Sequence, residues 1–169
     1  MFRSLMSSVT AVGAVVTSGA VLAVSGGIAA ADPSGAGSPT IVPLSAVPKR
    51  CDFSDIAGIP PATKGTGYTV VSRAGSTVNV EVHVTDFGPD IWYGLRLVEE
   101  PRPGDHCGAG DPGVATGRLY TDDSGNGSAT VQAPIMAGAS GAWIAVEGPA
   151  GASQQLSADN HSSDYIARF

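Results

Sequence analysis

A run of alternating valines constrains the fold of this chain more than any other feature of its sequence. Every second residue from Val78 to Val84 is valine, and the residues between them are polar. This period of two places the valines on one face of a β-strand, whereas a helix would scatter them over its surface. A second alternating run covers residues 91–98. We therefore predict two neighbouring strands, each with one buried face.

Short runs of the same kind recur between clusters of glycine, proline, asparagine and aspartate. We predict further strands at residues 68–73, 114–121, 128–133, 142–147 and 163–169, with a short one near Leu156. Beyond Ala31 we find no stretch of roughly ten residues with helical periodicity that is free of glycine and proline. About seven to eight short antiparallel strands at this spacing are typical of a β-sandwich. The predicted fold is therefore all-β, with an immunoglobulin-like or Greek-key β-sandwich as its architecture.

The N-terminal residues have the pattern of an export signal. An apolar stretch rich in small residues extends from Val9 to Val24, and Ala29-Ala30-Ala31 precede Asp32. The stretch is about 16 residues long, short of the roughly 20 that a membrane-spanning helix needs. Small residues at this position suit cleavage by a signal peptidase. We predict a signal peptide over residues 1–31 and, after its removal, a secreted protein with no transmembrane anchor.

The remaining chain is predicted to contain a spacer and one domain. Residues 32–50 are rich in proline, serine, glycine and alanine, a composition typical of a flexible spacer. Residues 51–169 then form the β-sandwich domain. The chain carries 9 Lys and Arg against 15 Asp and Glu, a formal net charge of −6. Because phosphate binding needs a concentrated cationic face, this balance argues against nucleic acid as a partner.

The junction from Ala29 to Pro33, in a chain rich in alanine, glycine and valine, resembles exported proteins of mycobacteria and related actinobacteria. The resemblance covers the signal and its junction only. It implies an extracytoplasmic location, with association with the cell wall as one form, and implies nothing about activity. The layout of the strands, in turn, resembles immunoglobulin-like sandwiches.

The two cysteines of the chain are predicted to form a disulfide. Cys51 and Cys107 both follow the predicted signal, and an even number of cysteines in an exported protein favours pairing. Closing the long loop between them would stabilise the fold by about 4 kcal/mol in the chain-entropy model. His106 is adjacent to Cys107 and therefore points in another direction, so a catalytic thiol is disfavoured. The three histidines of the chain show no zinc-ligand spacing with the cysteines, and we predict no cofactor.

Strand alternation also predicts a binding face. If Tyr93 and Leu95 face the core, the residues between and beside them, including Trp92 and Arg96, point outward. The same argument for two other strands completes the candidate face, which consists of Trp92, Arg96, Arg118, Tyr120, Trp143 and Glu147. Exposed aromatic surface suits sugars, lipids or a protein partner. The alternative is that loops or the spacer cover these rings, since large aromatic side chains are usually buried.

One turn has the beginning of a calcium loop. Asp122, Ser124 and Asn126 carry oxygen atoms at alternate positions, and Gly127 is at the sixth. The twelfth position should be a bidentate glutamate and is Ala133. A polar hairpin turn explains the same residues more simply, so calcium binding remains a weak alternative here.

No motif of a known catalytic site is present. The chain lacks the Gly-x-Ser-x-Gly elbow of hydrolases, a phosphate-binding loop and a dinucleotide fingerprint. The adjacent carboxylates of Glu99 and Glu100 would point to opposite sides of a strand. We predict a monomeric, non-enzymatic protein that binds an unidentified ligand or an envelope or host protein. The alternatives are an extracytoplasmic hydrolase acting on cell-wall or extracellular substrates and a calcium-stabilised structural module.

Overall fold

A computed structural model of the chain describes residues 38–58, 64–149 and 160–169. The chain divides into two compact units, Met1–Ala31 and Asp32–Phe169, and the described residues all belong to the second. The predicted signal peptide over residues 1–31 and the strand predicted near Leu156 lie outside the described residues. Within the described ranges, no helix is long and apolar enough to cross a membrane.

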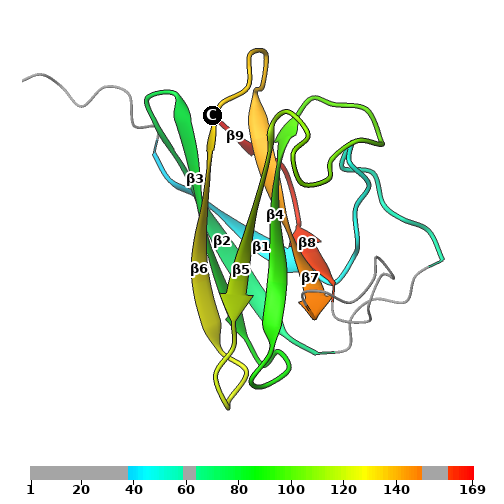
Figure 1. Cartoon of the computed structure of the whole chain (residues 1–169), viewed down its shortest axis with the longest axis vertical. Helices are drawn as coiled ribbons and strands as arrows, with labels where there is room; N and C mark the ends of the chain where they lie inside the picture. The colour runs from blue at the N-terminus through cyan, green and yellow to red at the C-terminus, as the bar shows by residue number, and fades with distance from the viewer. Residues whose placement is uncertain (1–37, 59–63, 150–159) are drawn as a thin grey trace, which may run out of the picture. The chain divides into compact units, whose positions relative to one another are not determined.

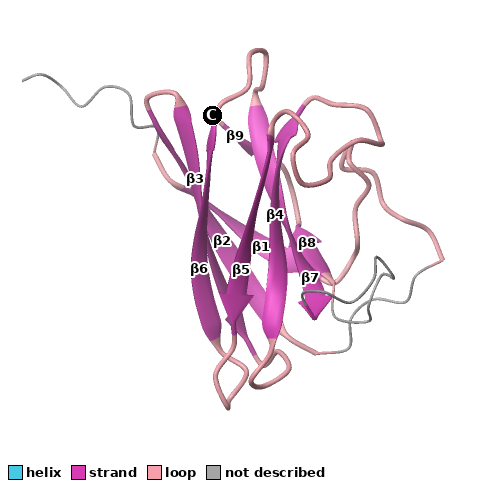
Figure 2. Cartoon of the chain, in the orientation of Figure 1, coloured by secondary structure: helices cyan, strands magenta, loops and turns pink. Residues whose placement is uncertain are grey.

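The described residues form nine β-strands and no helix (Figure 2). The strands are β1 (Thr40–Ser45), β2 (Thr66–Ala74), β3 (Thr77–Thr85), β4 (Trp92–Glu100), β5 (Val114–Tyr120), β6 (Gly127–Pro134), β7 (Gly141–Pro149), β8 (His161–Ser163) and β9 (Ala167–Arg168). All their pairings are antiparallel. The prediction of an all-β, antiparallel fold is confirmed for the part of the chain that the structure describes.

Strand β1 joins two groups of strands into one sheet. The hydrogen-bonded order is β5-β4-β7-β8-β1-β2-β3-β6, and β9 pairs with β7. Strands β5 and β6 are the ends of this order and also contact each other (Figure 1). The sheet is therefore nearly closed into a barrel, which leaves its outer faces to loops or solvent.

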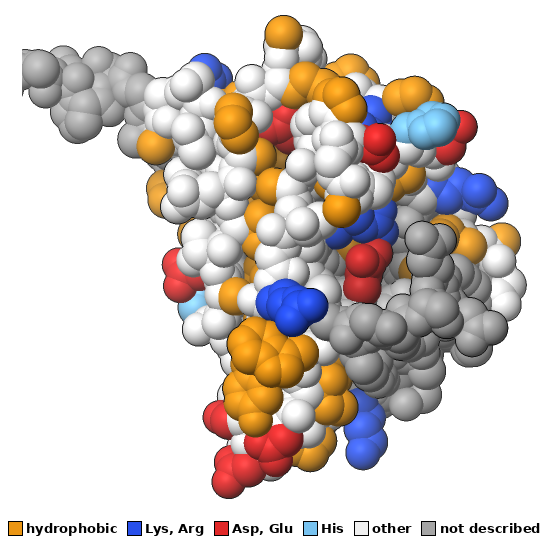
Figure 3. Space-filling view, viewed as in Figure 1, with side chains coloured by type: hydrophobic (Ala, Val, Ile, Leu, Met, Phe, Trp, Pro, Cys, Tyr) orange, Lys and Arg blue, Asp and Glu red, His pale blue; other side chains and the backbone are white. Residues whose placement is uncertain are grey.

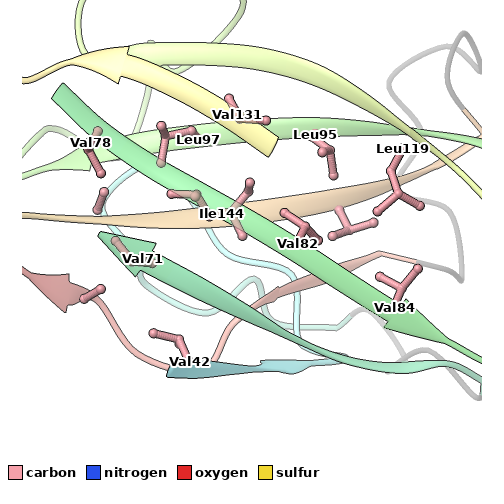
Figure 4. Packing of buried hydrophobic residues seen from close by; sticks show 14 of the residues in the cluster. Val42, Val71, Val78, Val82, Val84, Leu95, Leu97, Leu119, Val131 and Ile144 are labelled. Atoms are coloured by element: carbon pink, nitrogen blue, oxygen red, sulfur yellow. The ribbon is translucent and has the colours of Figure 1, made fainter. Parts of the chain in front are cut away.

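The core fills the space that the inner faces of the strands enclose. The four valines from Val78 to Val84 on β3 are each no more than 3 % exposed, because their alternation directs all of them inward. They pack in one cluster with Leu97 of β4 and Ile144 of β7. Figure 4 shows most of these side chains, with others of the cluster, gathered between the strands. The valine pattern in the sequence thus corresponds to the buried face of a strand.

The predicted spacer contains a strand of the fold, so the domain begins earlier than predicted. Residues Thr40–Ser45 form β1, which pairs with β2 on one side and β8 on the other. Val42 is fully buried in the core. A short strand placed between two others needs few bulky residues, so the Pro- and Ser-rich composition around it hid its role. The flexible spacer predicted at residues 32–50 is therefore wrong for the described part of that range, and the domain begins before Cys51.

The predicted disulfide is confirmed. Cys51 and Cys107 are bonded, with their Cα atoms 5.5 Å apart. Cys51 belongs to a locally folded segment, residues 48–58, which we call the cover segment. Within it, the Arg50 amide donates to the Ser54 carbonyl at 2.8 Å and the Ile56 amide to the Pro48 carbonyl at 3.0 Å. The disulfide fixes this segment to the loop that follows β4.

Candidate functional site

The six residues of the candidate face lie on the outer side of β4, β5 and β7. Between β4 and β5, Trp92 is opposite Tyr120 and Gly94 is opposite Arg118. Between β4 and β7, Gly94 is opposite Glu147 and Val98 is opposite Trp143. Residues directly opposite one another in a sheet share a face. Arg96 has the same parity on β4 as Trp92, so it joins them. The face has two ends that differ in structure: an open end at Trp92 and a covered end at Trp143.

Two exposed aromatic rings form the open end. Trp92 is 51 % exposed and Tyr120 is 44 % exposed. Their ring centroids are 5.1 Å apart, with an angle of 48° between the ring planes. Arg118 is exposed one step along the same face of β5. Figure 3 shows a hydrophobic patch toward the lower end of β4 and β5, with acidic side chains gathered below it. We call Trp92 and Tyr120 the open aromatic pair.

The open aromatic pair is held by the loops that flank it. The Tyr120 hydroxyl donates to Asp90 Oδ1 at 2.9 Å, and this hydrogen bond to the carboxylate raises the pKa of Tyr120 above its ordinary value. The Asp90 amide donates to the Asp122 carbonyl at 3.1 Å. The Thr121 hydroxyl donates to the Gly88 carbonyl at 2.6 Å. These bonds join the loop before β4 to the turn after β5, so the rings rest on a fixed support.

The centre of the face is occupied by internal interactions. Arg96 forms an ion pair with Glu147, with a distance of 3.0 Å between Arg96 Nε and Glu147 Oε1. The same guanidinium donates to the Cys107 carbonyl at 3.2 Å and lies 2.8 Å from Cys107 Sγ. It also lies over the ring of Trp143, 6.0 Å from the centroid. Arg96 therefore links the strands to the disulfide loop and has little capacity left for a ligand.

Trp143 is fully buried, which corrects its predicted exposure. Its ring is on the outer side of β7, as alternation requires, but the cover segment lies over it. The ring of Phe53 is 5.6 Å away at an angle of 59°. Trp143 Nε1 donates to Glu100 Oε1 at 2.9 Å. Alternation alone gives the side of the sheet and says nothing about what lies above it, so the sequence could not show this cover.

The two neighbouring carboxylates of β4 have separate structural roles. Glu100 contacts Trp143 on the outer side, and burial raises the pKa of Glu100 above its ordinary value, an effect that exceeds the opposing hydrogen bond from the indole. Glu99 is fully buried, and its Oε2 accepts from the Met136 amide at 2.7 Å. The two carboxylates point to opposite sides of β4 and have different partners, so they do not form the paired arrangement that acid–base catalysis uses.

The residues of the weak calcium candidate form a turn with internal hydrogen bonds. Asp122 Oδ1 accepts from the amides of Ser124 and Asn126 at 2.9 and 2.8 Å, and the Ser124 hydroxyl donates to Asp123 Oδ1 at 3.2 Å. Ala133, at the twelfth position of the loop pattern, is buried in β6. Across the residues that the structure describes, no group of three or more acidic, histidine or cysteine side chains is placed to hold a metal ion.

A second aromatic surface, which was not among the predicted site residues, lies on β2 and β3. Tyr68 of β2 is 43 % exposed and stacks on His83 of β3, with ring centroids 4.8 Å apart and an angle of 17°. His83 also lies 2.9 Å from Glu81. Alternation in β2, where Thr69 and Val71 point inward, would have shown that Tyr68 points outward. The contact of Phe53 with Trp143 and the hydrogen bond of Asp90 with Tyr120 could not be predicted from alternation, because Phe53 and Asp90 are in loops.

Comparisons with known proteins give no match. No family model, no curated protein and no solved structure is significantly similar to the chain. The function of this protein is therefore inferred from the geometry of its own residues.

Proposed function

We propose that this chain is an extracytoplasmic, non-enzymatic binding protein whose open aromatic pair contacts a ligand or partner. The observation that carries the proposal is the contact between two half-exposed rings, Trp92 and Tyr120, on one sheet face. Single exposed apolar residues are ordinary. Two large rings that are in contact and supported by fixed loops provide apolar area at a small entropic cost, which is how binding surfaces use aromatic residues.

The location and the finer fold are parts of the same proposal. The disulfide between Cys51 and Cys107 supports an oxidising compartment outside the cytoplasm. The N-terminal sequence, with its pattern of an export signal, supports the same compartment. Two groups of antiparallel strands, β2, β3 and β6 in one and β4, β5, β7 and β8 in the other, enclose one core, which supports an immunoglobulin-like or Greek-key sandwich.

A site-specific crosslinking experiment tests the binding face. The full-length chain is produced in an actinobacterial host with photoreactive benzoylphenylalanine in place of Tyr120, and is illuminated in envelope extract. The matched control has the same group in place of Tyr68, an aromatic residue with nearly the same exposure on another part of the sheet. We expect an adduct at position 120 that excess unlabelled protein suppresses and excess Trp92→Ala protein does not.

Two outcomes would contradict the proposal. One is an adduct of equal yield at positions 120 and 68, which would indicate random encounters. The other is equal suppression by the unlabelled protein and by its Trp92→Ala variant, which would show that the indole contributes nothing to recognition.

A further inference from the structure

Two acidic loops border the open aromatic pair. Residues 86–91 connect β3 to β4, and residues 121–126 connect β5 to β6. Between them they carry four exposed carboxylates and no lysine or arginine: Asp86, Asp90, Asp122 and Asp123. We call these two segments the acidic loops. They place a concentration of negative charge directly beside two exposed rings.

The acidic loops are fixed in position relative to the rings. The Asp90 carboxylate accepts a hydrogen bond from the Tyr120 hydroxyl, and the Asp90 amide donates one to the Asp122 carbonyl. The Phe87 amide donates to the Gly125 carbonyl at 3.1 Å. Gly125 has a φ of 76°, and a Cβ atom there would lie 2.2 Å from the Phe87 carbonyl oxygen. Only glycine allows this close approach, so the two loops form one rigid, negatively charged corner beside the pair.

This arrangement favours a cationic group over an anionic one. The face of an aromatic ring attracts cations through its quadrupole, and neighbouring carboxylates add to the attraction. Among cations, a guanidinium group is planar, stacks on a Trp ring and donates paired hydrogen bonds to carboxylates. Trp92 together with Asp90 and the other acidic loop residues offers both kinds of contact at one site.

The spread of charge favours a polypeptide over a single small cation. The four carboxylates belong to two loops, and the rings form an open surface, each about half exposed. A single small cation could use only part of this area. Arg118, exposed beside the pair on β5, bears the same charge as such a ligand. It would repel a basic segment on that side, which directs the segment toward the rings and the acidic loops.

We propose that the open aromatic pair and the acidic loops bind an arginine-rich segment of a partner protein. One arginine stacks on Trp92, and others pair with the carboxylates of Asp90 and Asp123. This inference rests on the proposed function, because it names the partner chemistry of the same face.

A peptide titration tests the charge requirement. The probe is a fluorescein-labelled peptide with four arginines separated by glycines, and its control is the same peptide with citrulline, an uncharged analogue of arginine. Fluorescence anisotropy measures binding to the purified full-length protein. We expect binding of the arginine peptide only, and weaker binding at higher ionic strength because the charges are exposed.

Matched variants locate the site. Trp92→Ala should weaken the affinity roughly tenfold through loss of the stacking contact. The double variant Asp90→Asn and Asp123→Asn should weaken it about threefold to fivefold through loss of exposed ion pairs. Asparagine tolerates the positive φ of 55° at Asp90 and keeps an oxygen for the Tyr120 hydroxyl, so the fold is retained.

The control variant, Tyr68→Ala with Glu81→Gln, removes an exposed ring and a carboxylate elsewhere and should bind normally.

The outcomes separate this inference from the proposed function. Equal binding of the arginine and citrulline peptides, or normal binding by Trp92→Ala, would overturn the inference. If neither peptide binds while the crosslink at position 120 still depends on Trp92, the arginine proposal is wrong and the binding face remains. If both experiments fail, both proposals are wrong.

Discussion

The two tryptophans of this chain are on the same side of one sheet and have opposite surroundings. Trp143 is fully buried beneath the cover segment, whereas Trp92 is 51 % exposed. The difference comes from the disulfide, which fixes the cover segment over one end of the face and leaves the other end open. Strand alternation therefore determines the direction of a side chain, and loops determine whether solvent or a ligand can reach it.

The largest expected contrast is between the two tryptophan-to-alanine variants. Trp143→Ala should lower the free energy of unfolding by roughly 3–5 kcal/mol, because it leaves a cavity under the cover segment. Trp92→Ala should lower it by only about 1 kcal/mol, because the half-exposed ring loses its contact with Tyr120 and leaves no internal cavity. Equilibrium denaturant unfolding measures both, with Trp143→Phe as a milder variant if the alanine form does not fold. Similar losses for the two alanine variants would remove the distinction between the two ends.

Removing the disulfide should uncover Trp143. Replacing Cys51 and Cys107 with serine should lower the free energy of unfolding by about 2–4 kcal/mol and release the cover segment from the sheet. In a Trp92→Phe background, Trp143 is the one remaining tryptophan, so its fluorescence reports its surroundings directly. We expect emission at longer wavelength than in the Trp92→Phe protein with the disulfide intact. Unchanged emission would show that the segment stays in place without the bond.

Glu100, a buried carboxylate at the covered end, should have a smaller effect on the free energy of unfolding, and this effect should depend on pH. Burial raises the pKa of Glu100 above 4.5, so the folded state binds this proton more tightly than the unfolded state does. Its contribution to stability therefore falls as the pH rises from 4.5 through the raised pKa. Glu100→Gln keeps an oxygen for Trp143 Nε1 and cannot ionise. We expect the stability of this variant, relative to wild type, to increase over that pH interval in denaturant unfolding.

Asp52 in the cover segment provides a control, because its pKa is shifted in the opposite direction from that of Glu100. Hydrogen bonds from the Ser54 hydroxyl and amide lower the pKa of Asp52 below 3.8. Its contribution to stability is therefore present above pH 3.8 and is lost as the pH falls through the lowered pKa. Asp52→Asn should be less stable than wild type at neutral pH, with a difference that shrinks in acid. If the stabilities of the two variants relative to wild type change with pH in the same direction, Glu100 and Asp52 do not have pKa shifts of opposite direction.

The smallest expected effect concerns calcium at the open end. Asp122 Oδ1 already accepts two backbone hydrogen bonds, so we expect the turn to be stable without an ion. The melting temperature should be the same with millimolar calcium as with a chelator. A rise with calcium that the chelator reverses would show an ion site among the acidic loops and would weaken the proposal of an arginine-rich partner.

The sequence predicted the parts of the fold that depend on local periodicity. Alternation identified the inner face of β3 and the outward side of Trp92, and the number of cysteines identified the disulfide. Strand β1 was missed because its burial depends on pairing with β2 and β8, which are distant in the sequence. The nearly closed sheet was also beyond prediction, since it requires the contact between β5 and β6.

The sequence predicted to which side of the sheet the candidate residues point, but not which of them are exposed. All six residues lie on one face, but Trp143 is covered and Arg96 is engaged by Glu147 and the Cys107 loop. The support of the open aromatic pair by Asp90 depends on a bond between residues in separate loops. No periodic pattern in the sequence encodes such a contact.

Hydroxyl-radical footprinting of the native protein tests the central contrast most directly, because mass spectrometry follows both tryptophans in a single sample. We expect rapid oxidation at Trp92 and strong protection at Trp143 while the disulfide is intact. Comparable oxidation rates at the two residues would contradict the division of this face into a covered and an open end.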